Sequence, residues 1–503
     1  MSLLAGVLLI VLSTSIGRAL LPDRHRLERS LWEELGLAYL LGTAFTVVLI
    51  TAGFLVGLKL GLLWWLPLLA GIAAFVPDHR RRTSLGALQP VPWNRATGIA
   101  LAIMALASFV ATLALPLNEF DPIYHFAYRG KVLLFDGTPL SEAITGMIHP
   151  DGYGRMVTHP NYPFGVPILE AWVAKLGGWN DRWVQLPLAL WAACLPMAIA
   201  VGLRGYSKRA AALGAMLAAA TPMLYTADFP VDGWENLSLA GLGGEMMLGG
   251  GADLAVAAMF GSACAMLLRA YRMEDRHTAF CASLLLGGAV MMKNEGLGLA
   301  GVLLLATFLG MLVPPRRTKV LLPFAGLAVI LILPWLGLRA QLPAIDENYS
   351  EQMTVENVLH YLGGGRELVE KSPEAVSNRQ AVDLENAPAR IGLVWEAFLE
   401  EFLDWRSWGI LWLLALAGLP YTLHRLKSAE HRWLALLVLG GVTLYFLILL
   451  VTPWNFPSLR QKGIPERLLV HLTGPILLLF GTAWALGQSQ DSESTGSPAP
   501  PQS

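Results

Sequence analysis

A stretch between Leu113 and Pro139 joins an apolar run to residue types that can do acid–base and phosphate chemistry. Directly after the apolar run the chain places Glu119, Asp121, His125, Arg129 and Lys131. A carboxylate at the end of a hydrophobic span is costly without a partner, so Asp121 and Glu119 are functional candidates. On a helix that follows, His125 and Arg129 are four residues apart and share one face. The simpler alternative is a pair of interface carboxylates solvated by the loop.

A second group of polar residues interrupts the apolar run 278–313 near its middle, in the sequence MMKNEGLGLA. A plain turn needs only Asn and Gly, so Lys293 and Glu295 exceed what the geometry of a turn requires. They are therefore candidates for a site. The alternative is a self-satisfied Lys–Glu pair that caps two helices.

Two further groups stand at the starts of later apolar runs. Asp253 opens one run, where an N-cap role explains it, although a cap can also line a site. Before the last run come Arg460, Lys462 and Arg467, and His471 follows Arg467 on the same helical face. Cations at this level suit the phosphate of a lipid headgroup. For Arg460 and Lys462 the favoured alternative is that they are snorkelling anchors.

The composition defines the protein class that must position these residues. The chain has 503 residues, of which 55% are hydrophobic and 15% charged, and its mean hydropathy is +0.52. Such a chain has too few polar residues to coat a soluble globule, so we predict an all-α polytopic membrane protein. The net charge of -1 argues against nucleic acid as a partner. Cys194, Cys264 and Cys281 lie in apolar runs and indicate core packing rather than disulfides or a thiolate metal site.

Apolar runs long enough to cross a hydrocarbon core of about 30 Å predict about thirteen transmembrane helices. The runs are 2–21, 35–56, 60–77, 96–115, 184–203, 210–226, 252–271, 278–292, 296–313, 320–338, 404–423, 433–452 and 468–487. We interpret the first as a retained span, because no Lys or Arg precedes it and no cleavage site follows it. The basic short connections all fall on one face, which is cytoplasmic by the positive-inside rule. The four polar groups then share the opposite, extracytoplasmic face.

The division of the chain follows from this topology. An ambiguous apolar stretch at 162–179 is expected as a helix in the outer interface, with Glu170 and Lys175 on its wet side. A fourteen-span arrangement, in which this stretch crosses, is the alternative. The apolar spacing in IGLVWEAFLEEFL predicts a second helix lying on the membrane. The expected units are N-terminal transmembrane helices 1–95, a transmembrane module 96–338 with an outer loop 116–183, an extracytoplasmic loop 339–403, C-terminal transmembrane helices 404–487 and a disordered tail 488–503.

The four groups, in this order, resemble the GT-C superfamily of integral membrane glycosyltransferases. The nearest branch holds protein O-mannosyltransferases and aminoarabinose transferases, which are glycosyltransferase family 39-like. The resemblance rests on NEFD after an early span and on THPNYPFGVPILEAW from Thr158 to Trp172. Downstream it rests on the Asp253 motif, on MMKNEG, which is similar to the family's Thr-Lys-Gly turn, and on the Arg467 region. The chain departs from the family in its three additional N-terminal spans and in reading Lys-Asn-Glu-Gly at the turn.

The resemblance implies an inverting transfer of a sugar from a polyprenyl-phosphate donor to an acceptor on the outer face. It implies a general base, for which Asp121 is the first choice and Glu119 the second, in an acidic site beside cations for the departing phosphate. The residues expected to bind the donor phosphate or substrate are Lys293, Arg467, Arg129, Lys131, His125, Glu295, Asp253, His159 and Tyr162. The expected partners are the lipid-linked donor, membrane lipids and a protein, lipid or glycan acceptor. The expected location is a bacterial inner membrane.

Two other functions remain open at this level. A polymerase or ligase of lipid-linked glycans would use Arg366, Arg379 and His360 of the second outer loop. A transporter or flippase for an amphiphile would need charges along a path through the bilayer, whereas here they gather at one face. No cofactor is certain. Oxygen ligands to Mg²⁺ or Mn²⁺ could come from Asp121 and Asp253, and also from Asp228, Asp232 and Glu235, although acidic outer loops are more often simply solvated. The sugar and the acceptor are not specified by the sequence.

Overall fold

The computed structural model builds the chain from α-helices and short connections. It describes residues 1–22, 30–83, 102–103, 106, 109–110, 117, 121–146, 159–225, 251–314, 316–343, 353–365, 389–426, 428–452 and 464–494. Within these ranges the description of side chains leaves out 76–83, 121, 225, 417, 421, 425 and 486–494.

The N-terminal half forms three long helices and a set of shorter ones. These elements are α1 (Ser2–Leu20), α3 (Leu31–Leu55), α4 (Leu60–Leu63), α5 (Trp65–Thr83), the π-helix η1 (Asp121–Ala127), α7 (Tyr128–Asp136), α8 (Glu142–Thr145), α9 (Gly165–Gly177), the 3₁₀ turn η2 (Leu186–Leu190), α10 (Trp191–Arg204), α11 (Lys208–Ala219) and the 3₁₀ turn η3 (Pro222–Tyr225).

The C-terminal half follows the predicted runs more regularly. Its elements are α12 (Asp253–Met273), α13 (Arg276–Met292), α14 (Asn294–Leu312), α15 (Thr318–Arg339), α17 (Val355–Leu362), α18 (Arg390–Leu403), α19 (Trp405–Trp408), α20 (Leu411–Arg425), α21 (Ala429–Val451), α23 (Ile464–Leu469), the 3₁₀ turn η4 (Val470–Leu472) and α24 (Thr473–Ser494). The last helix therefore continues past the predicted end of the C-terminal span at 487.

Eight helical segments in the described part of the chain are long and apolar enough to cross a membrane. They are Ser2–Leu20, Leu31–Leu55, Leu186–Arg204, Asp253–Met273, Asn294–Leu312, Thr318–Arg339, Ala429–Val451 and Ile464–Ala485. The chain is thus an all-α polytopic membrane protein, as its composition predicts. The count of thirteen spans stays a prediction, because most of the run 96–115 lies outside the described residues and α11, α13 and α20 are shorter.

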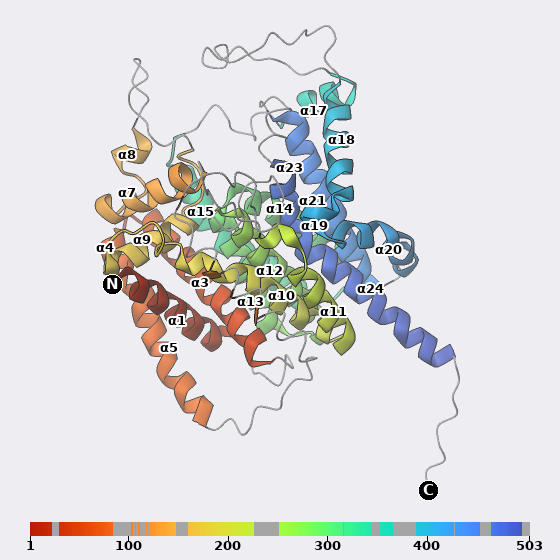
Figure 1. The fold of residues 1–503 in the computed structure, drawn as a ribbon, viewed down its shortest axis with the longest axis horizontal. Helices are drawn as coiled ribbons and strands as arrows, with labels where there is room; N and C mark the ends of the chain where they lie inside the picture. Colours follow the sequence, from red (N-terminus) through yellow and green to blue (C-terminus); the bar gives the residue numbers. More distant parts are fainter. Residues whose placement is uncertain are drawn as a thin grey trace, which may run out of the picture.

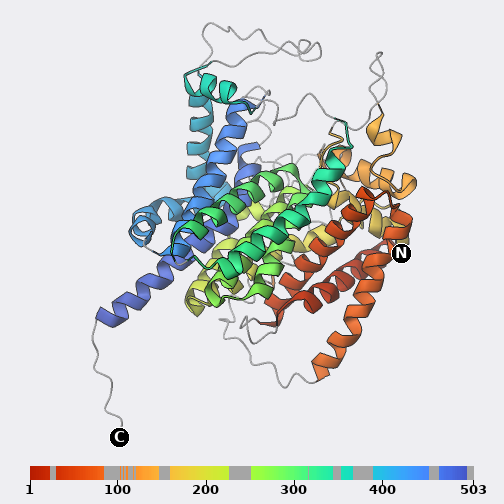
Figure 2. The same cartoon turned by 180° about the vertical axis from the view of Figure 1, so that it is seen from behind.

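The helices from the middle of the sequence separate the two ends of the chain. Figures 1 and 2, which view opposite sides, both show α1, α3 and α5 on one flank and α18, α21 and α24 on the other. Between them, α12 is buried along nearly its whole length and packs on α10, α13 and α24. α3 packs against α10, α13 and α15 and so joins the N-terminal helices to the central bundle, whereas α5 packs on α1.

α1 and α3 cross closely because glycines face backbone at the crossing. A Cβ built on Gly17 would lie 1.7 Å from the Ala38 carbonyl oxygen, and one on Gly42 would lie 1.7 Å from the Ser13 carbonyl oxygen. Any side chain at either position would force the two helices apart. Small residues at such contacts are how membrane helices reach close packing.

Buried ion pairs tie the end of α10 to the start of α3. Ser30 caps α3 in a capping box with Glu33. The Glu33 carboxylate also accepts hydrogen bonds from Arg204, with Nη1 at 2.7 Å from Oε2. Nearby, the Nε of Arg18 donates to Glu34 at 2.7 Å. These charges lie at helix ends on the predicted cytoplasmic side and hold α1, α3 and α10 in register.

The stretch 162–179 is helical, as predicted, but its predicted wet side is wrong for Glu170. In α9 every residue from Gly165 to Ala174 is buried, and Glu170 is 0% exposed, whereas Lys175 is exposed. The reason is that α1, α3, α7 and α13 all pack around this helix. With 13 residues, α9 is about 20 Å long and so shorter than the hydrocarbon core.

Candidate functional site

Lys293 stands at the break between two apolar helices. α13 ends at Met292 and α14 begins at Asn294, and the backbone of Lys293 between them is extended, with φ -156° and ψ 156°. The side chain is buried, and its Nζ lies 2.8 Å from Oδ1 of Asp253 and 3.1 Å from Oε1 of Glu295. The predicted interruption is present, and the Lys–Glu pair that was the simpler alternative exists as part of a larger group.

Asp253 accepts from a second cation through its other oxygen. Oδ2 of Asp253 lies 2.9 Å from both Nε and Nη2 of Arg467, which approaches from α23. Asp253 is the first residue of α12, whose N-cap is Ala252, so the predicted N-cap role does not hold. Its carboxylate instead joins two cations that are 40 and 214 residues distant in sequence.

His471 completes this group from the start of the last span. Its Nε2 lies 3.2 Å from Oδ1 of Asp253, and its Nδ1 lies 2.6 Å from the hydroxyl oxygen of Tyr445 on α21. The sequence placed His471 on the same face as Arg467, but nothing in the spacing signalled Tyr445. We call Asp253, Lys293, Glu295, Arg467 and His471 the Asp253 cluster.

The Asp253 cluster is balanced in charge and buried. The two cations Lys293 and Arg467 face the two carboxylates Asp253 and Glu295, and Asp253, Lys293 and Arg467 are each less than 8% exposed. Interactions between charges are stronger in such a buried setting than in water. Two acceptors here are buried and have no hydrogen-bond donor among the described residues. They are Oε2 of Glu295, within the cluster, and Oδ1 of the neighbouring Asn294. The arrangement therefore offers fixed cations next to unsatisfied acceptors.

A second group, the histidine–tyrosine cluster, consists of His125, His159 and Tyr162. The ring centroids of His125 and His159 are 4.4 Å apart, and His159 stacks on Tyr162 at 4.8 Å. The HPNYP segment thus packs on the helix that begins at Asp121. The structure brings together three residues that the sequence assigned to one site from separate motifs.

Arg129 holds this segment in place through backbone contacts. Its guanidinium donates to the carbonyl oxygens of His125 at 3.4 Å and Pro163 at 3.3 Å, and also to that of Tyr162. It lies over the Phe164 ring at 3.7 Å. Burial lowers the pKa of Arg129 to about 9. These carbonyls occupy Nη1 and Nη2, so Arg129 acts as a clamp on the 159–164 segment, whereas its Nε has no hydrogen-bond partner among the described residues.

The segment that follows the histidine–tyrosine cluster contacts the end of α13. A Cβ built on Gly165, at the start of α9, would lie 2.5 Å from the Met291 carbonyl oxygen and 2.7 Å from Sδ of Met292. Met292 directly precedes Lys293. The segment that carries His159 and Tyr162 therefore reaches the same end of the bundle as the Asp253 cluster.

Other predicted residues lie elsewhere or outside the description. Asp121 starts the π-helix η1, a geometry frequent at functional sites, but its side chain and all of Glu119 lie outside the described residues. Lys131 is exposed, 3.9 Å from Asp181 and above the Trp179 ring at 5.2 Å. Its contacts are with the loop after α9, not with the Asp253 cluster.

Glu170 is a buried acid that sequence reasoning placed in water. Neither carboxyl oxygen has a hydrogen-bond partner among the described residues. Burial, followed by the charge of Asp181, raises the pKa of Glu170 well above its usual value. Its Oε2 faces Gly130, where a Cβ would come within 2.9 Å.

Glu401 is a second perturbed acid, and it lies close to Arg467 in the fold. Its Oε2 accepts from Nε1 of Trp408 at 3.0 Å. Burial and the neighbouring carboxylate of Glu466 raise the pKa of Glu401 to about 8. Because Glu466 directly precedes Arg467, the two acids contact the segment that supplies a cation to the cluster. The amphipathic pattern of α18 predicted its helix but gave no sign of this pairing.

A divalent metal does not fit at Asp253. Both of its oxygens are within 3.2 Å of Lys293, Arg467 or His471, so cations of the protein already take the positions a metal would need. Among the described residues no group of three or more His, Cys, Asp or Glu side chains could hold a metal ion. The acidic residues Asp228, Asp232 and Glu235 lie outside the described part.

The chain is similar in structure to known membrane proteins at low sequence identity. One is the archaeal oligosaccharyltransferase AglB from Archaeoglobus fulgidus, in complex with an inhibitory peptide and a dolichol-phosphate. The sequences are 13% identical, the TM-score is 0.45, and the match covers 81% of this chain and 52% of AglB. Another is ArnT from Cupriavidus metallidurans bound to undecaprenyl phosphate. The sequences are 14% identical, the TM-score is 0.46, and the match covers 79% of this chain and 62% of ArnT. The chain thus spans less than two thirds of the length of either protein. No protein-family model and no curated protein matches the sequence.

Proposed function

We propose that this chain transfers a sugar from a polyprenyl-phosphate donor to an acceptor at the extracytoplasmic face of the membrane, with inversion. The observation that carries the proposal is the convergence of Lys293, Arg467 and Asp253 at buried helix ends. These residues come from three separate motifs of the resemblance to GT-C glycosyltransferases. A lipid donor keeps its isoprenoid tail in the bilayer while its phosphate reaches a site at the ends of the spans.

The cations serve the departing phosphate. In an inverting transfer the acceptor oxygen attacks the anomeric carbon as the bond from that carbon to the phosphate oxygen breaks. Lys293 and Arg467 then stabilise the negative charge that develops on the leaving group. Asp253 is a positioning residue, because it fixes both cations before the reaction starts.

The acceptors beside the cations suit the sugar. Asn294 Oδ1 and Glu295 Oε2 are buried and have no donor in the part of the chain that the structure describes, and sugar hydroxyls would supply donors. Asn161 is 5% exposed and directly precedes Tyr162 of the histidine–tyrosine cluster. Its Oδ1 is likewise a buried acceptor without a hydrogen-bond donor among the described residues. Buried acceptors that gain donors on binding discriminate strongly for a hydroxylated ligand.

Asp121 is proposed as the general base, with Glu119 as the second choice. A base must lie within hydrogen-bond reach of the acceptor proton. Asp121 begins the helix that carries His125, and that helix packs against residues 159–164. The next residue, Gly165, lies against Met291 and Met292, which directly precede Lys293. The donor sugar, whether a hexose or a pentose, and the acceptor are not specified by these contacts.

The test is sugar transfer in vesicles that contain the purified protein and a radiolabelled polyprenyl-phosphate sugar. We expect Lys293→Met to lower the rate by roughly 10²–10³-fold, the usual effect of removing one group that stabilises the leaving charge. Lys175→Met is the matched control, because Lys175 is exposed at the end of α9. Asp121→Asn is expected to abolish transfer while leaving the protein folded.

Folding is checked separately so that a null result stays interpretable. Lys293→Arg keeps the charge, and thermal melting in detergent reports whether each variant is folded. Full activity of folded Lys293→Met would overturn the phosphate role. Transfer of a preassembled glycan would indicate a polymerase or ligase instead, and uptake into sealed vesicles without glycosyl transfer would indicate a transporter.

A further inference from the structure

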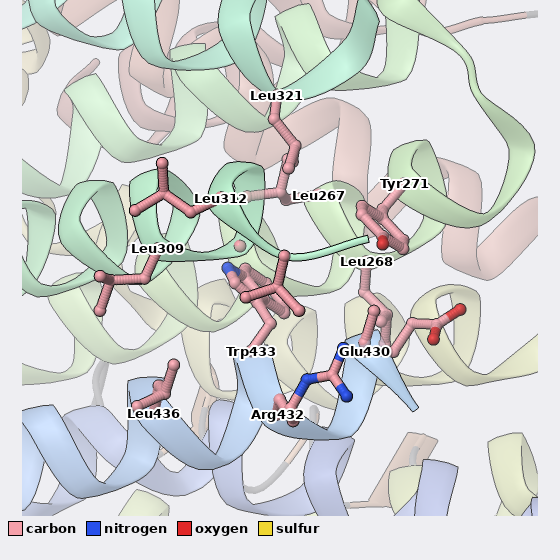
Figure 3. A pocket seen from close by; sticks show the side chains of 13 residues that line it. Leu267, Leu268, Tyr271, Leu309, Leu312, Leu321, Glu430, Arg432, Trp433 and Leu436 are labelled. Carbon is pink, nitrogen blue, oxygen red and sulfur yellow. The ribbon is translucent and has the colours of Figure 1, made fainter. Parts of the chain in front are cut away.

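An apolar cavity lies at the opposite end of the helices that carry the Asp253 cluster. It has a volume of about 260 Å³ and is walled by α12, α14, α15 and α21 (Figure 3). Its lining includes Leu267 and Tyr271 of α12. At about 1.5 Å per residue, these side chains are about 21–27 Å along α12 from Asp253. The cavity is therefore near the other membrane interface, on the predicted cytoplasmic side.

The cavity opens onto the surface that faces the bilayer. Leu309 and Leu312 of α14 line it and are 36% and 56% exposed, and the next residue, Val313, is 43% exposed. Leu436 of α21 also lines it and is 40% exposed. Exposed leucines on membrane-spanning helices contact acyl chains. An occupant can therefore enter from the lipid, and the volume suits a segment of one apolar chain rather than a whole ligand of drug size.

One polar atom in the wall lacks a partner. Nε1 of Trp433 is buried and has no hydrogen-bond acceptor among the described residues. Figure 3 shows Trp433 of α21 facing the leucines of α14 across the cavity, with Glu430 and Arg432 on the same side as Tyr271. An indole N–H left unpaired in an apolar setting is costly, and an ester carbonyl of a lipid would satisfy it.

Cations gather at the polar end of the cavity. Arg432 donates to the Pro314 carbonyl oxygen at 3.3 Å, and Arg317 lies over the ring of Tyr271 at 5.1 Å while pairing with Glu274 at 2.6 Å. The three segments that meet here, 271–276, 313–319 and 429–433, carry six Lys or Arg residues and three carboxylates. The excess positive charge favours an anionic headgroup.

We propose that this cavity binds one anionic glycerophospholipid of the cytoplasmic leaflet. An acyl chain occupies the leucine-lined space, an ester carbonyl accepts from Trp433, and the phosphate lies among the cations of the 313–319 segment. The site is separate from the Asp253 cluster and independent of the sugar transfer proposed above.

The test compares lipid retention by the intact protein after mild delipidation, measured by native mass spectrometry with phosphatidylglycerol and phosphatidylcholine of matched acyl chains. Gly310 lines the cavity, and a Cβ there would lie 3.8 Å from Trp433 with room beyond, so Gly310→Leu fills the space. Gly301→Leu is the control on the same helix, because a Cβ there meets nothing within 4 Å. We expect wild type and Gly301→Leu to retain one phosphatidylglycerol, and Gly310→Leu to bind it at least tenfold more weakly.

A surface variant keeps the test decisive if Gly310→Leu fails to fold. Arg316 and Lys319 are exposed beside the cavity, and Arg316→Gln with Lys319→Gln is expected to reduce the preference for phosphatidylglycerol by roughly tenfold or more. Three results would overturn the proposal. They are equal retention by the folded Gly310→Leu and Gly301→Leu proteins, equal binding of the two lipids by wild type, and displacement of phosphatidylglycerol by an equimolar polyprenyl phosphate.

Discussion

The contacts of Asp253 predict a large energetic coupling between residues that are far apart in the chain. In Asp253→Asn, Arg467 loses a charged partner at 2.9 Å and Lys293 loses one at 2.8 Å. The side chains of these cations are only 8% and 6% exposed, so water cannot replace the carboxylate. Removing one member of a buried ion pair costs about 3–5 kcal/mol, and we expect Asp253→Asn to reduce stability by that amount.

The assay is a double-mutant cycle with Arg467→Gln. If the charges interact directly, the double variant lowers the excess buried positive charge, and it should recover about 2 kcal/mol or more relative to the sum of the single variants. Stability is read as the free energy of unfolding from titration with SDS in mixed micelles. The cycle is run in the same way for Lys131 and Asp181, a pair 3.9 Å apart with side chains 45% and 53% exposed.

The control pair sets the scale for the result. An exposed ion pair contributes about 0–1 kcal/mol, so its coupling should be far smaller than that of Asp253 with Arg467. If the effects of Asp253→Asn and Arg467→Gln on the free energy of unfolding simply add, or if the two cycles give equal coupling energies, the Asp253 cluster is not a buried ion network.

Three further predictions concern other parts of the fold. The pKa of Glu401 is raised from 4.5 to about 8, so the stability that its protonated form contributes is full below about pH 4.5 and is lost as the pH rises through 8. Glu401→Gln should therefore reduce the dependence of the melting temperature on pH between 4.5 and 8, and an unchanged pH dependence would contradict the assignment. Gly42→Ala should destabilise the protein by about 1–3 kcal/mol in an SDS titration, because its Cβ would lie 1.7 Å from the Ser13 carbonyl oxygen, whereas Gly301→Ala should have little effect. Arg129→Lys keeps the charge but loses the contacts to three carbonyls, so we expect faster proteolysis within 159–164 in the ligand-free protein; protection equal to wild type would refute the clamp.

Much of the candidate site could be predicted from the sequence, because its charged residues interrupt or begin apolar runs. Lys293 interrupts an apolar run, and a charged residue in such a place must end one helix and start another or find a partner. Asp253 and Arg467 could be assigned to the same face from the alternation of spans. Their meeting in one cluster follows from the topology, which places the ends of alternate helices on one side.

The remaining features depend on tertiary packing that no local pattern encodes. Glu170 and Lys175 are on a short amphipathic helix, and a helix of that kind is ordinarily half solvated. Only the packing of α1, α3, α7 and α13 around α9 decides that Glu170 is buried. Arg129 is similar, because its role depends on carbonyls more than thirty residues away in the 159–164 segment. The contact of Tyr445 with His471 joins two spans whose relative rotation the sequence does not specify.

An experimental structure of the protein with bound polyprenyl phosphate would show whether the Asp253 cluster binds the phosphate of the donor. We expect the phosphate oxygens within hydrogen-bond distance of Lys293 and Arg467, about 2.7–3.2 Å, with the lipid tail leaving between the spans. A phosphate bound instead among the cations of the 313–319 segment, or at the end of the bundle away from Asp253, would contradict this expectation.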